Sequence, residues 1–438
     1  MRATLTTTFQ SLQVRNYRIF ATGQLIKLIG VWMMFIAQDW LVLQLSDDSA
    51  TALGVVVALQ FTPVLLFTLI FGRLADRYDK RLLLFIANTM WFVLSIAMSV
   101  LVLTGVVELW HVFVFAALLG VGNALETPVR QAFVSELVGT PLLPNALALS
   151  SATFNTARIV GPAVAGLAIA AFDVGPVFLI SAIASAAPLI GLIQMRAGDL
   201  YRADLPVGGV RDAAKVMDGL RYVARRPDLM LPMGLMAVMG LLLFNFQLTL
   251  AALAKTVFNT GAASFGLFTT ALATGALAGA LAASGRRGRP SVYVVLGSGL
   301  AFAGLGTLVG LAPMYWLVVV LLVPTGFFMV YFAQASNQRV QLGVDAAFRG
   351  RVMALWVLVF LGTNPVGAPA IGWVAEHVGA GASIWLGGLL SFLISAAALA
   401  WQLRRTGGRL RLRWAAPLPR FYVRTHPRLR DDLALIES

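Results

Sequence analysis

The sequence contains no cysteine and only three histidines among its 438 residues. The absence of cysteine excludes a disulfide framework and thiol chemistry, and it leaves a structural zinc site without its usual ligands. Charged residues are also scarce, because they make up 12% of the chain where an average soluble domain has about one quarter. We therefore expect no metal site and no cofactor.

Apolar residues take the place of the missing charges. They make up 59% of the chain, and the mean hydropathy is +0.83. A soluble fold of this length could not bury so much apolar surface, so the sequence predicts a polytopic membrane protein. The net charge of +14 does not indicate a nucleic-acid partner, because the arginines lie in short stretches that flank apolar runs.

Motifs of several enzyme and pump classes are missing from the sequence. No Gly-x-x-x-x-Gly-Lys-Ser/Thr stretch exists to hold ATP. Adjacent aspartates, which a magnesium-dependent transferase would need, occur only as Asp47-Asp48 and Asp431-Asp432, outside the apolar runs. An intramembrane serine protease would need a membrane-embedded histidine, but His111, His377 and His426 lie at the ends of apolar runs or in the tail. We expect no enzyme and no catalytic residue.

Twelve apolar segments are long enough to cross a bilayer, which takes about twenty residues. We expect an all-α protein of twelve transmembrane helices in two pseudo-symmetric six-helix bundles. One long polar stretch separates the halves, which gives bundles at 1–195 and 229–402, a cytoplasmic linker at 196–228 and a basic cytoplasmic tail at 403–438. The expected spans are 17–44, 50–73, 82–104, 110–129, 146–171, 174–195, 229–254, 263–284, 291–311, 314–337, 352–375 and 381–402.

The basic residues orient these spans. With the N-terminus in the cytoplasm, all of the 33 Lys and Arg residues except Lys27, Arg158 and Lys255 fall on the cytoplasmic side. The loops on the other side carry mainly acidic residues. No cleavable signal is apparent near the N-terminus. We expect a multi-pass protein of the bacterial inner membrane with both termini in the cytoplasm.

The loop after the second span, residues 72–81, reads Gly-Arg-Leu-Ala-Asp-Arg-Tyr-Asp-Lys-Arg. This loop resembles the one between the second and third helices of the major facilitator superfamily, although Asp79 stands where that family usually has a second glycine. The resemblance implies a conformational latch, and Glu126 and Arg130 at the cytoplasmic end of the fourth span could form a charge cluster with Asp76 and Arg77. The expected members of the latch are Gly72, Asp76, Arg77, Arg81 and Arg130. Topology and loop capping alone are the alternative role.

Ionisable residues inside spans are costly unless they are paired or hydrated, so they mark functional candidates. Asp39, Glu126 and Arg158 are our candidates for proton coupling. Asp39 could bind a proton in a water-filled cavity between the halves, or it could pair with a basic residue as a structural partner. Arg158 could pair with Asp39 or Glu126, or it could attract an anionic substrate. Lys27, in the first span, could reach toward the inner surface.

The fifth span carries Gly161, Pro162 and Gly166, directly after Arg158. Gly-Pro at this place resembles the antiporter motif of facilitator-family exporters, with Ala165 where that motif has the first of two closing glycines. The proline removes a backbone hydrogen bond and the glycines allow close helix approach. The resemblance implies export in place of import.

Several further stretches resemble a bacterial branch of the superfamily that contains the enterobactin exporter and drug-efflux proteins. They are 30–43, 128–132, 219–223 and 348–353. The resemblance implies alternating access and proton-coupled export of an amphipathic organic compound, either a drug-like molecule or a siderophore. An uncoupled facilitator or a lipid-moving transporter of the same fold is the alternative, and neutralising Asp39 would leave its transport intact.

Uncharged polar residues in the spans are candidates for lining a substrate cavity, although such residues also join helices by hydrogen bonds. In the linker, an amphipathic helix at 208–228 could lie on anionic lipids of the inner leaflet. We expect a monomer whose partners are the substrate, protons and the bilayer. The cavity candidates are Gln24, Gln38, Asn123, Asn155, Asn245 and Gln334.

Overall fold

The computed structural model describes residues 9–201, 216–286, 288–345, 348–406, 409–415 and 418–424. Helices make up nearly all the regular structure in these ranges, which confirms the predicted all-α membrane fold. Eleven of the described helical segments are long and apolar enough to cross a membrane. One of the eleven is two helices joined end to end, so the described chain holds twelve spans.

The second and third spans begin at side-chain caps. The hydroxyl of Ser49 accepts a hydrogen bond from the backbone N–H of Ala52, and the Asp79 carboxylate accepts one from Leu82. Asp79 therefore starts the third span, which accounts for an acidic residue where the resembling family has glycine. These elements are η1 (Gln10–Gln13), α2 (Arg15–Leu45), α3 (Ala50–Arg77) and α4 (Lys80–Leu103).

Helix α5 (Leu109–Phe172) has 64 residues, about three times what a bilayer needs. It reverses at Gly139, whose φ of 68° lies in the left-handed region that favours glycine. Contacts with α2 show the reversal, because Phe20 packs edge to face on Phe133 before the glycine, while the hydroxyl of nearby Tyr17 donates to the carbonyl of Ala146 after it. The fourth and fifth spans are therefore the two arms of α5.

The sixth span consists of α6 (Val174–Ser185) and α7 (Ala187–Gln194). The short helix η2 (Ala197–Asp199) follows it. Most of the predicted linker helix lies outside the described residues, and its end is α8 (Val216–Ala224).

The seventh span was predicted as one helix, but it is broken after Leu242, and Asn245 precedes the next helical segment. The later spans are continuous, and a two-stranded antiparallel hairpin that the sequence had not indicated follows the last one. The elements are α9 (Pro227–Leu242), α10 (Phe246–Ala252), η4 (Leu253–Val257), α11 (Ala262–Ser284), α12 (Val292–Leu311), α13 (Tyr315–Gly343), α14 (Arg349–His377), α15 (Ala380–Thr406), β1 (Arg409–Ala415) and β2 (Leu418–Arg424).

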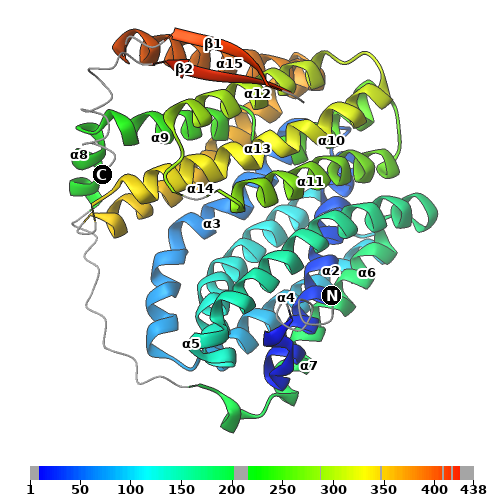
Figure 1. Ribbon diagram of the computed structural model, residues 1–438. Helices are drawn as coiled ribbons and strands as arrows, with labels where there is room; N and C mark the ends of the chain where they lie inside the picture. Colours follow the sequence, from blue (N-terminus) through cyan, green and yellow to red (C-terminus); the bar gives the residue numbers. More distant parts are fainter. Residues whose placement is uncertain are drawn as a thin grey trace.

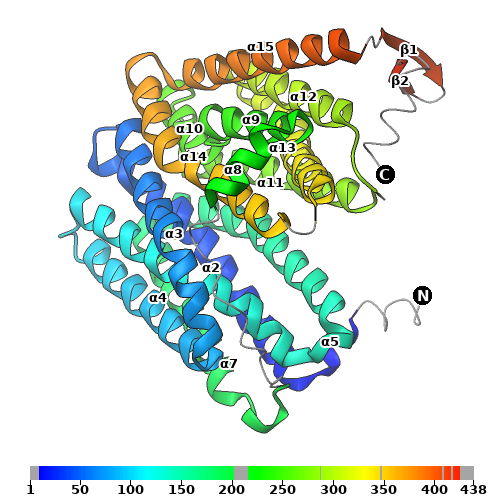
Figure 2. The ribbon, with the colours of Figure 1, turned by 90° about the vertical axis from the view of Figure 1, so that its left-hand side faces the viewer.

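Helices α2–α7 form one group and α9–α15 form a second, which lies above the first in both ribbon views (Figures 1 and 2). We call them the N-half and the C-half. Contacts of α3 with α14, of α5 with α11 and of α10 with both α2 and α3 join the halves. One buried apolar cluster runs through both halves and includes Leu41 and Leu250, whereas a second, around Phe133, lies within the N-half.

The connections between spans lie at two opposite ends of the molecule. We call one the acidic end; it comprises the connections at 46–49, 104–108, 173, 258–261, 312–314 and 378–379. The other is the arginine-rich end, with the described connecting residues 78–79, 139, 195–201, 285–286, 288–291, 344–345 and 348. In Figure 2 the α2–α3 and α14–α15 connections of the acidic end lie on the left.

Candidate transport site

Asp39 lies in α2, where its side chain is buried with 3% of its surface exposed. Its carboxylate accepts a hydrogen bond of 2.7 Å from Nε2 of Gln247. Gln247 belongs to α10, so the bond joins the N-half to the C-half. A buried carboxylate needs such a partner because water is excluded from it. Sequence reasoning located Asp39 but did not find the partner.

Further contacts between the halves surround this bond at the acidic end. Nζ of Lys255 lies 3.1 Å from the Asp48 carboxylate and 5.0 Å from the ring centre of Trp40. The Glu376 carboxylate accepts hydrogen bonds from the Ser49 hydroxyl at 2.5 Å and the Thr51 backbone N–H at 2.9 Å. These contacts, together with the Asp39 bond, hold the halves together at this end.

A second buried charge site lies wholly inside the N-half. Nζ of Lys27 is 2.5 Å from Oε2 of Glu126 and 2.8 Å from Oδ1 of Asn88, and it lies over the ring of Trp91. Arg130 is farther away, with Nε 3.9 Å from Oε1 of Glu126. The pair satisfies two charges that would each be costly alone in a membrane span.

Lys27 was not among the three candidates for proton coupling. The structure nevertheless gives it a partner, Glu126. The sequence held one usable signal, since Glu126 and Asp39 are the carboxylates inside the N-half spans and a buried lysine needs one of them. Choosing between the two required the packing of α2 against α4 and α5.

Arg158 lies on the second arm of α5, and its guanidinium stacks over the ring of Trp32 at 5.7 Å. Among the described residues it forms no ion pair, so the expected pairing with Asp39 or Glu126 is not what the structure shows. Phe154 also packs against Trp32, edge to face. The site is therefore aromatic and positively charged.

Gly161, Pro162 and Gly166 lie where three helices meet. A side chain at Gly161 would collide with Trp32 of α2, which leaves room for glycine alone. On the other side, a Cβ on Gly166 would lie 3.0 Å from the carbonyl of Ala262 in α11 and 3.1 Å from Cα of Gly266. The motif therefore packs α5 against its own half and against the C-half.

Of the expected latch residues, Arg130 lies near Glu126, but the others form no described ion pair with it. Asp76 and Arg77 are exposed and form no ion pair with another described residue, and Gly72 faces open space. Lys80, which we had not selected, binds Glu136 at 2.7 Å. Nε of Arg81 donates to the carbonyl of Leu192 at 3.0 Å. Each of these contacts stays within the N-half.

The C-half has its own network at the arginine-rich end. Asp228 binds Arg226 at 3.0 Å and Arg289 at 2.7 Å. Arg226 donates hydrogen bonds to the Asp228 carboxylate, and this interaction raises the pKa of the Arg226 guanidinium. Helix α8 joins this network, because Nη1 of Arg226 donates to the Tyr222 hydroxyl at 3.0 Å. Tyr222 also stacks on Phe348, with ring centres 4.5 Å apart. Packing against the C-half thus orients the described part of the linker helix.

The polar cavity candidates differ in their surroundings. Gln24 and Gln38 are buried, and neither amide finds a hydrogen-bond partner among the described residues. Asn123 and Gln334 are exposed inside their spans, while Asn155 donates to the carbonyl of Ser151.

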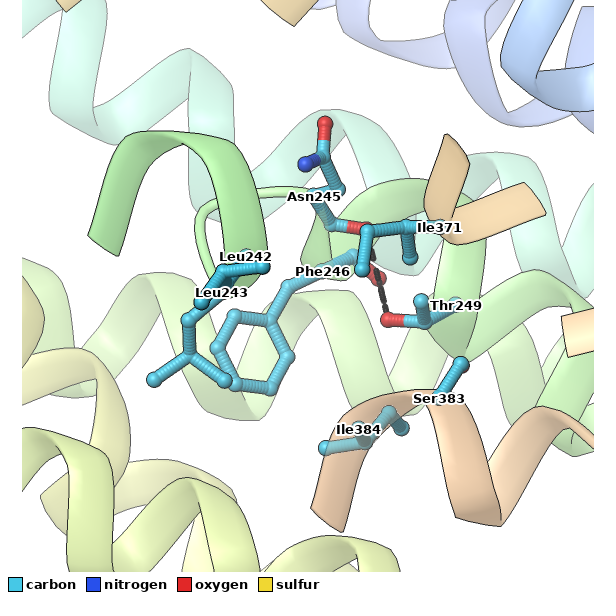
Figure 3. A pocket seen from close by; sticks show the side chains of 8 residues that line it. All are labelled: Leu242, Leu243, Asn245, Phe246, Thr249, Ile371, Ser383 and Ile384. Atoms are coloured by element: carbon cyan, nitrogen blue, oxygen red, sulfur yellow. Dashed lines mark hydrogen bonds between the residues drawn. The ribbon is translucent and has the colours of Figure 1, made fainter. Parts of the chain in front are cut away.

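Asn245 lines a gap at the break between α9 and α10 (Figure 3). The gap is too narrow to admit a water molecule, so it is a packing feature in this conformation and not a ligand site. Its lining is Leu242, Leu243, Asn245, Phe246, Thr249, Ile371, Ser383 and Ile384.

Comparison with known proteins supports the fold and the kind of protein. A family model described as transmembrane secretion effector matches residues 6–425. The chain is 30% identical over 167 residues to the staphyloferrin A transporter of Staphylococcus aureus, covering 38% of this chain and 42% of that one. It therefore spans less than half the length of that relative.

Two longer matches cover most of the chain. The multidrug efflux pump Tap of Mycolicibacterium fortuitum is 26% identical, with 80% of this chain and 87% of Tap aligned. The enterobactin exporter EntS of Escherichia coli is 23% identical, with 81% and 84% aligned.

Among solved structures, a bacterial homologue of the lysosomal transporter Spinster, in an inward-facing and unoccupied conformation, matches with a TM-score of 0.67 at 12% identity. That match covers 92% of this chain and 98% of the other, and it shows a shared fold. The chain belongs to the transmembrane secretion effector family of major facilitator transporters. Its family and these relatives are membrane transporters and not enzymes, which agrees with the prediction from the sequence.

Proposed function

We propose that this member of the family exports an amphipathic organic small molecule across the bacterial inner membrane by alternating access, in exchange for protons. The arginine-rich end, with both termini, faces the cytoplasm in this proposal, in keeping with the excess of basic residues there. The described conformation is then closed toward the outside. Its N-half and C-half, with the boundaries predicted above, are the two units that rock against each other.

The observation that carries the proposal is the hydrogen bond between Asp39 and Gln247. An ionised carboxylate only accepts hydrogen bonds, whereas a protonated one also donates. Proton binding at Asp39 therefore changes a contact that holds the halves together at the acidic end. A proton that enters from the outside can in this way bias which end is open, which is the requirement for coupling.

Glu126 is the less suitable coupling group, because its closest partner, Lys27, lies in the same half. Protonating Glu126 would leave the Lys27 charge unpaired inside the N-half without touching a contact between halves. We assign that pair to the stability of the N-half. Asp76 and Arg77 remain our proposed latch for the conformation open to the outside.

The bilayer also enters the proposal. Helix α8 packs on the C-half through Tyr222, and Arg221 in the helix and Arg225 directly after it are exposed at the arginine-rich end. Basic side chains near a cytoplasmic membrane surface attract anionic lipids. We propose that α8 rests on inner-leaflet head groups, and that the transporter works as a monomer.

Flux in proteoliposomes tests the coupling. Wild type should accumulate a substrate against its gradient when a pH gradient is applied, using a panel of lipophilic cations and aromatic anions. Asp39→Asn should only equilibrate the same substrate. Asp48→Asn is the matched control, because it removes a carboxylate from another contact between the halves whose side chain is 42% exposed.

Two results would contradict the proposal. If Asp39→Asn concentrates substrate as wild type does, Asp39 is not the coupling acid. If wild type equilibrates substrate and never concentrates it, the protein is an uncoupled facilitator.

A further inference from the structure

Arg158 differs from Lys27, Asp39 and Glu126 because its side chain has neither a counter-charge nor a hydrogen-bond partner among the described residues. Lys27 is paired with Glu126, and the Asp39 carboxylate is bonded to Gln247. A guanidinium cannot be neutralised by losing its proton in a protein. A permanent charge inside a membrane span therefore needs water or an anion that the chain itself does not supply here.

The position of Arg158 on its helix points it away from lipid. Ser151, Asn155 and Arg158 are spaced by four and three residues, so they share one face of the second arm of α5. The most exposed apolar residues in the next turns are Val160, Val164 and Leu167, at 37%, 42% and 69% exposure. At about 100° per residue, Val160 lies about 200° from Arg158, on the opposite face. The lipid-facing side and the charged side are thus distinct.

The charged face meets both halves of the molecule. Trp32 of the N-half lies under the guanidinium. The hydroxyl of Thr270, from α11 of the C-half, donates to the carbonyl of Ile159, the residue next to Arg158. Arg158 is therefore placed at the boundary between the halves, where a transported molecule must pass.

Aromatic rings surround this charge. Trp32 contacts Phe35 and Phe154 edge to face, with ring centres 5.8 and 5.9 Å apart. Trp32 and Phe35 are partly exposed, so they offer apolar surface. Asp39 is seven residues beyond Trp32 on the same face of α2, about 10 Å along the helix. The aromatic surface of Trp32 and Phe35 thus extends from the Arg158 guanidinium toward Asp39, the proposed proton site.

We propose that Arg158 and Trp32 form the binding site for an amphipathic organic anion, the substrate class of this transporter. The guanidinium binds the acidic group, a carboxylate or catecholate, through N–H donors that no described residue occupies. The apolar body of the ligand packs on Trp32, Phe35 and Phe154. As an assignment of the transported substrate this rests on the proposed export function, whereas the binding site can be tested without transport.

Equilibrium binding to the purified full-length protein, without any gradient, tests the site. The probes are radiolabelled 1-naphthoate and 1-naphthylmethylammonium, which have the same aromatic body and opposite charges. Wild type should bind the anion more tightly than the cation. Arg158→Gln should weaken anion binding by about ten- to a hundredfold, the usual range for a hydrogen bond to a charged group, and Arg158→Lys should restore part of it.

Two controls separate charge from folding. Arg404→Gln removes the same charge from an exposed position in the last turn of α15 and should leave anion binding unchanged. Trp32→Ala should weaken binding of both probes, because it removes the shared aromatic contact. Thermal unfolding of each variant identifies any that are misfolded, and Arg158→Lys provides the folded comparison if Arg158→Gln is lost.

The proposal is overturned if wild type prefers the cation or binds neither probe, or if Arg158→Gln binds the anion as tightly as wild type does. Asp39→Asn should still bind the anion in this assay. Loss of proton-driven flux with intact anion preference would therefore leave the binding site standing, while loss of anion preference with intact flux would remove the site and spare the export proposal.

Discussion

The two ends of this transporter are held together in different ways. At the acidic end, polar contacts run between the halves: Asp48 with Lys255, Glu376 with Ser49 and Thr51, and, deeper, Asp39 with Gln247. At the arginine-rich end, the described polar contacts stay within one half. Lys80 binds Glu136 in the N-half, and Asp228 binds Arg226 and Arg289 in the C-half.

This difference indicates at which end the halves can separate with fewer polar contacts broken. The halves can separate at the arginine-rich end without breaking a described ion pair, whereas separation at the acidic end breaks several contacts. Partly exposed pairs such as Asp48–Lys255 contribute about 0–1 kcal/mol each. A hydrogen bond to a buried charged group contributes about 1.5–3 kcal/mol. The Asp39–Gln247 bond is therefore the largest polar contribution to closure of the acidic end. Binding of a proton and a ligand can offset a contribution of a few kcal/mol.

Distances between spin labels can measure the opening of each end. Because the chain has no cysteine, introduced cysteines are the only labelling sites. Asp47→Cys with Val378→Cys reports on the acidic end, and Tyr78→Cys with Leu342→Cys reports on the arginine-rich end. All four positions are exposed, and each pair joins the two halves.

The largest effect should follow from Gly372→Ala. A Cβ at this position in α14 would collide with the carbonyl of Ala50 in α3, so the halves can no longer meet there. Overpacking costs about 1–3 kcal/mol, which should favour opening of the acidic end about tenfold. Gly234→Ala, where a Cβ meets nothing within 4 Å, is the control. An unchanged label distance in Gly372→Ala would show that this contact does not limit closure.

A shift of comparable size toward opening of the acidic end should follow from Gln247→Ala. The substitution leaves the Asp39 carboxylate buried without its donor, at a cost of about 1–3 kcal/mol in the closed conformation. Water can hydrate Asp39 once the halves separate, so the open population should rise. Gln334→Ala, an exposed glutamine in α13, serves as the matched control. Equal label distances in Gln247→Ala and Gln334→Ala would show that the Asp39–Gln247 bond does not hold the acidic end closed.

Lys80→Gln should give the smallest change in either label distance. Lys80 is buried against Glu136 within the N-half, so losing it weakens that half and not the contact between halves. The thermal unfolding temperature should fall, while the ratio of the two conformations stays within about twofold. A clear shift of the label distances would show that the arginine-rich end also controls opening.

The sequence predicted the membrane spans well because span length and apolar composition are local properties. It also selected Asp39 and Arg158, since few charges enter the spans. Pairing was harder to predict. Lys27 pairs with Glu126 and not with Asp39, because α4 and α5 place Asn88 and Glu126 beside it. This placement depends on helix packing. The break before Asn245 likewise has no strong signal, because residues 241–244 are all apolar and include neither glycine nor proline.

Label distances at the acidic end, measured at pH 8 and pH 5.5, test the central claim that a proton on Asp39 loosens the closure. Wild type should show a longer distance at pH 5.5, since protonation turns an acceptor of the Gln247 bond into a group that also donates. Asp39→Asn should show one distribution at both pH values. A pH response in Asp39→Asn equal to that of wild type would contradict the claim.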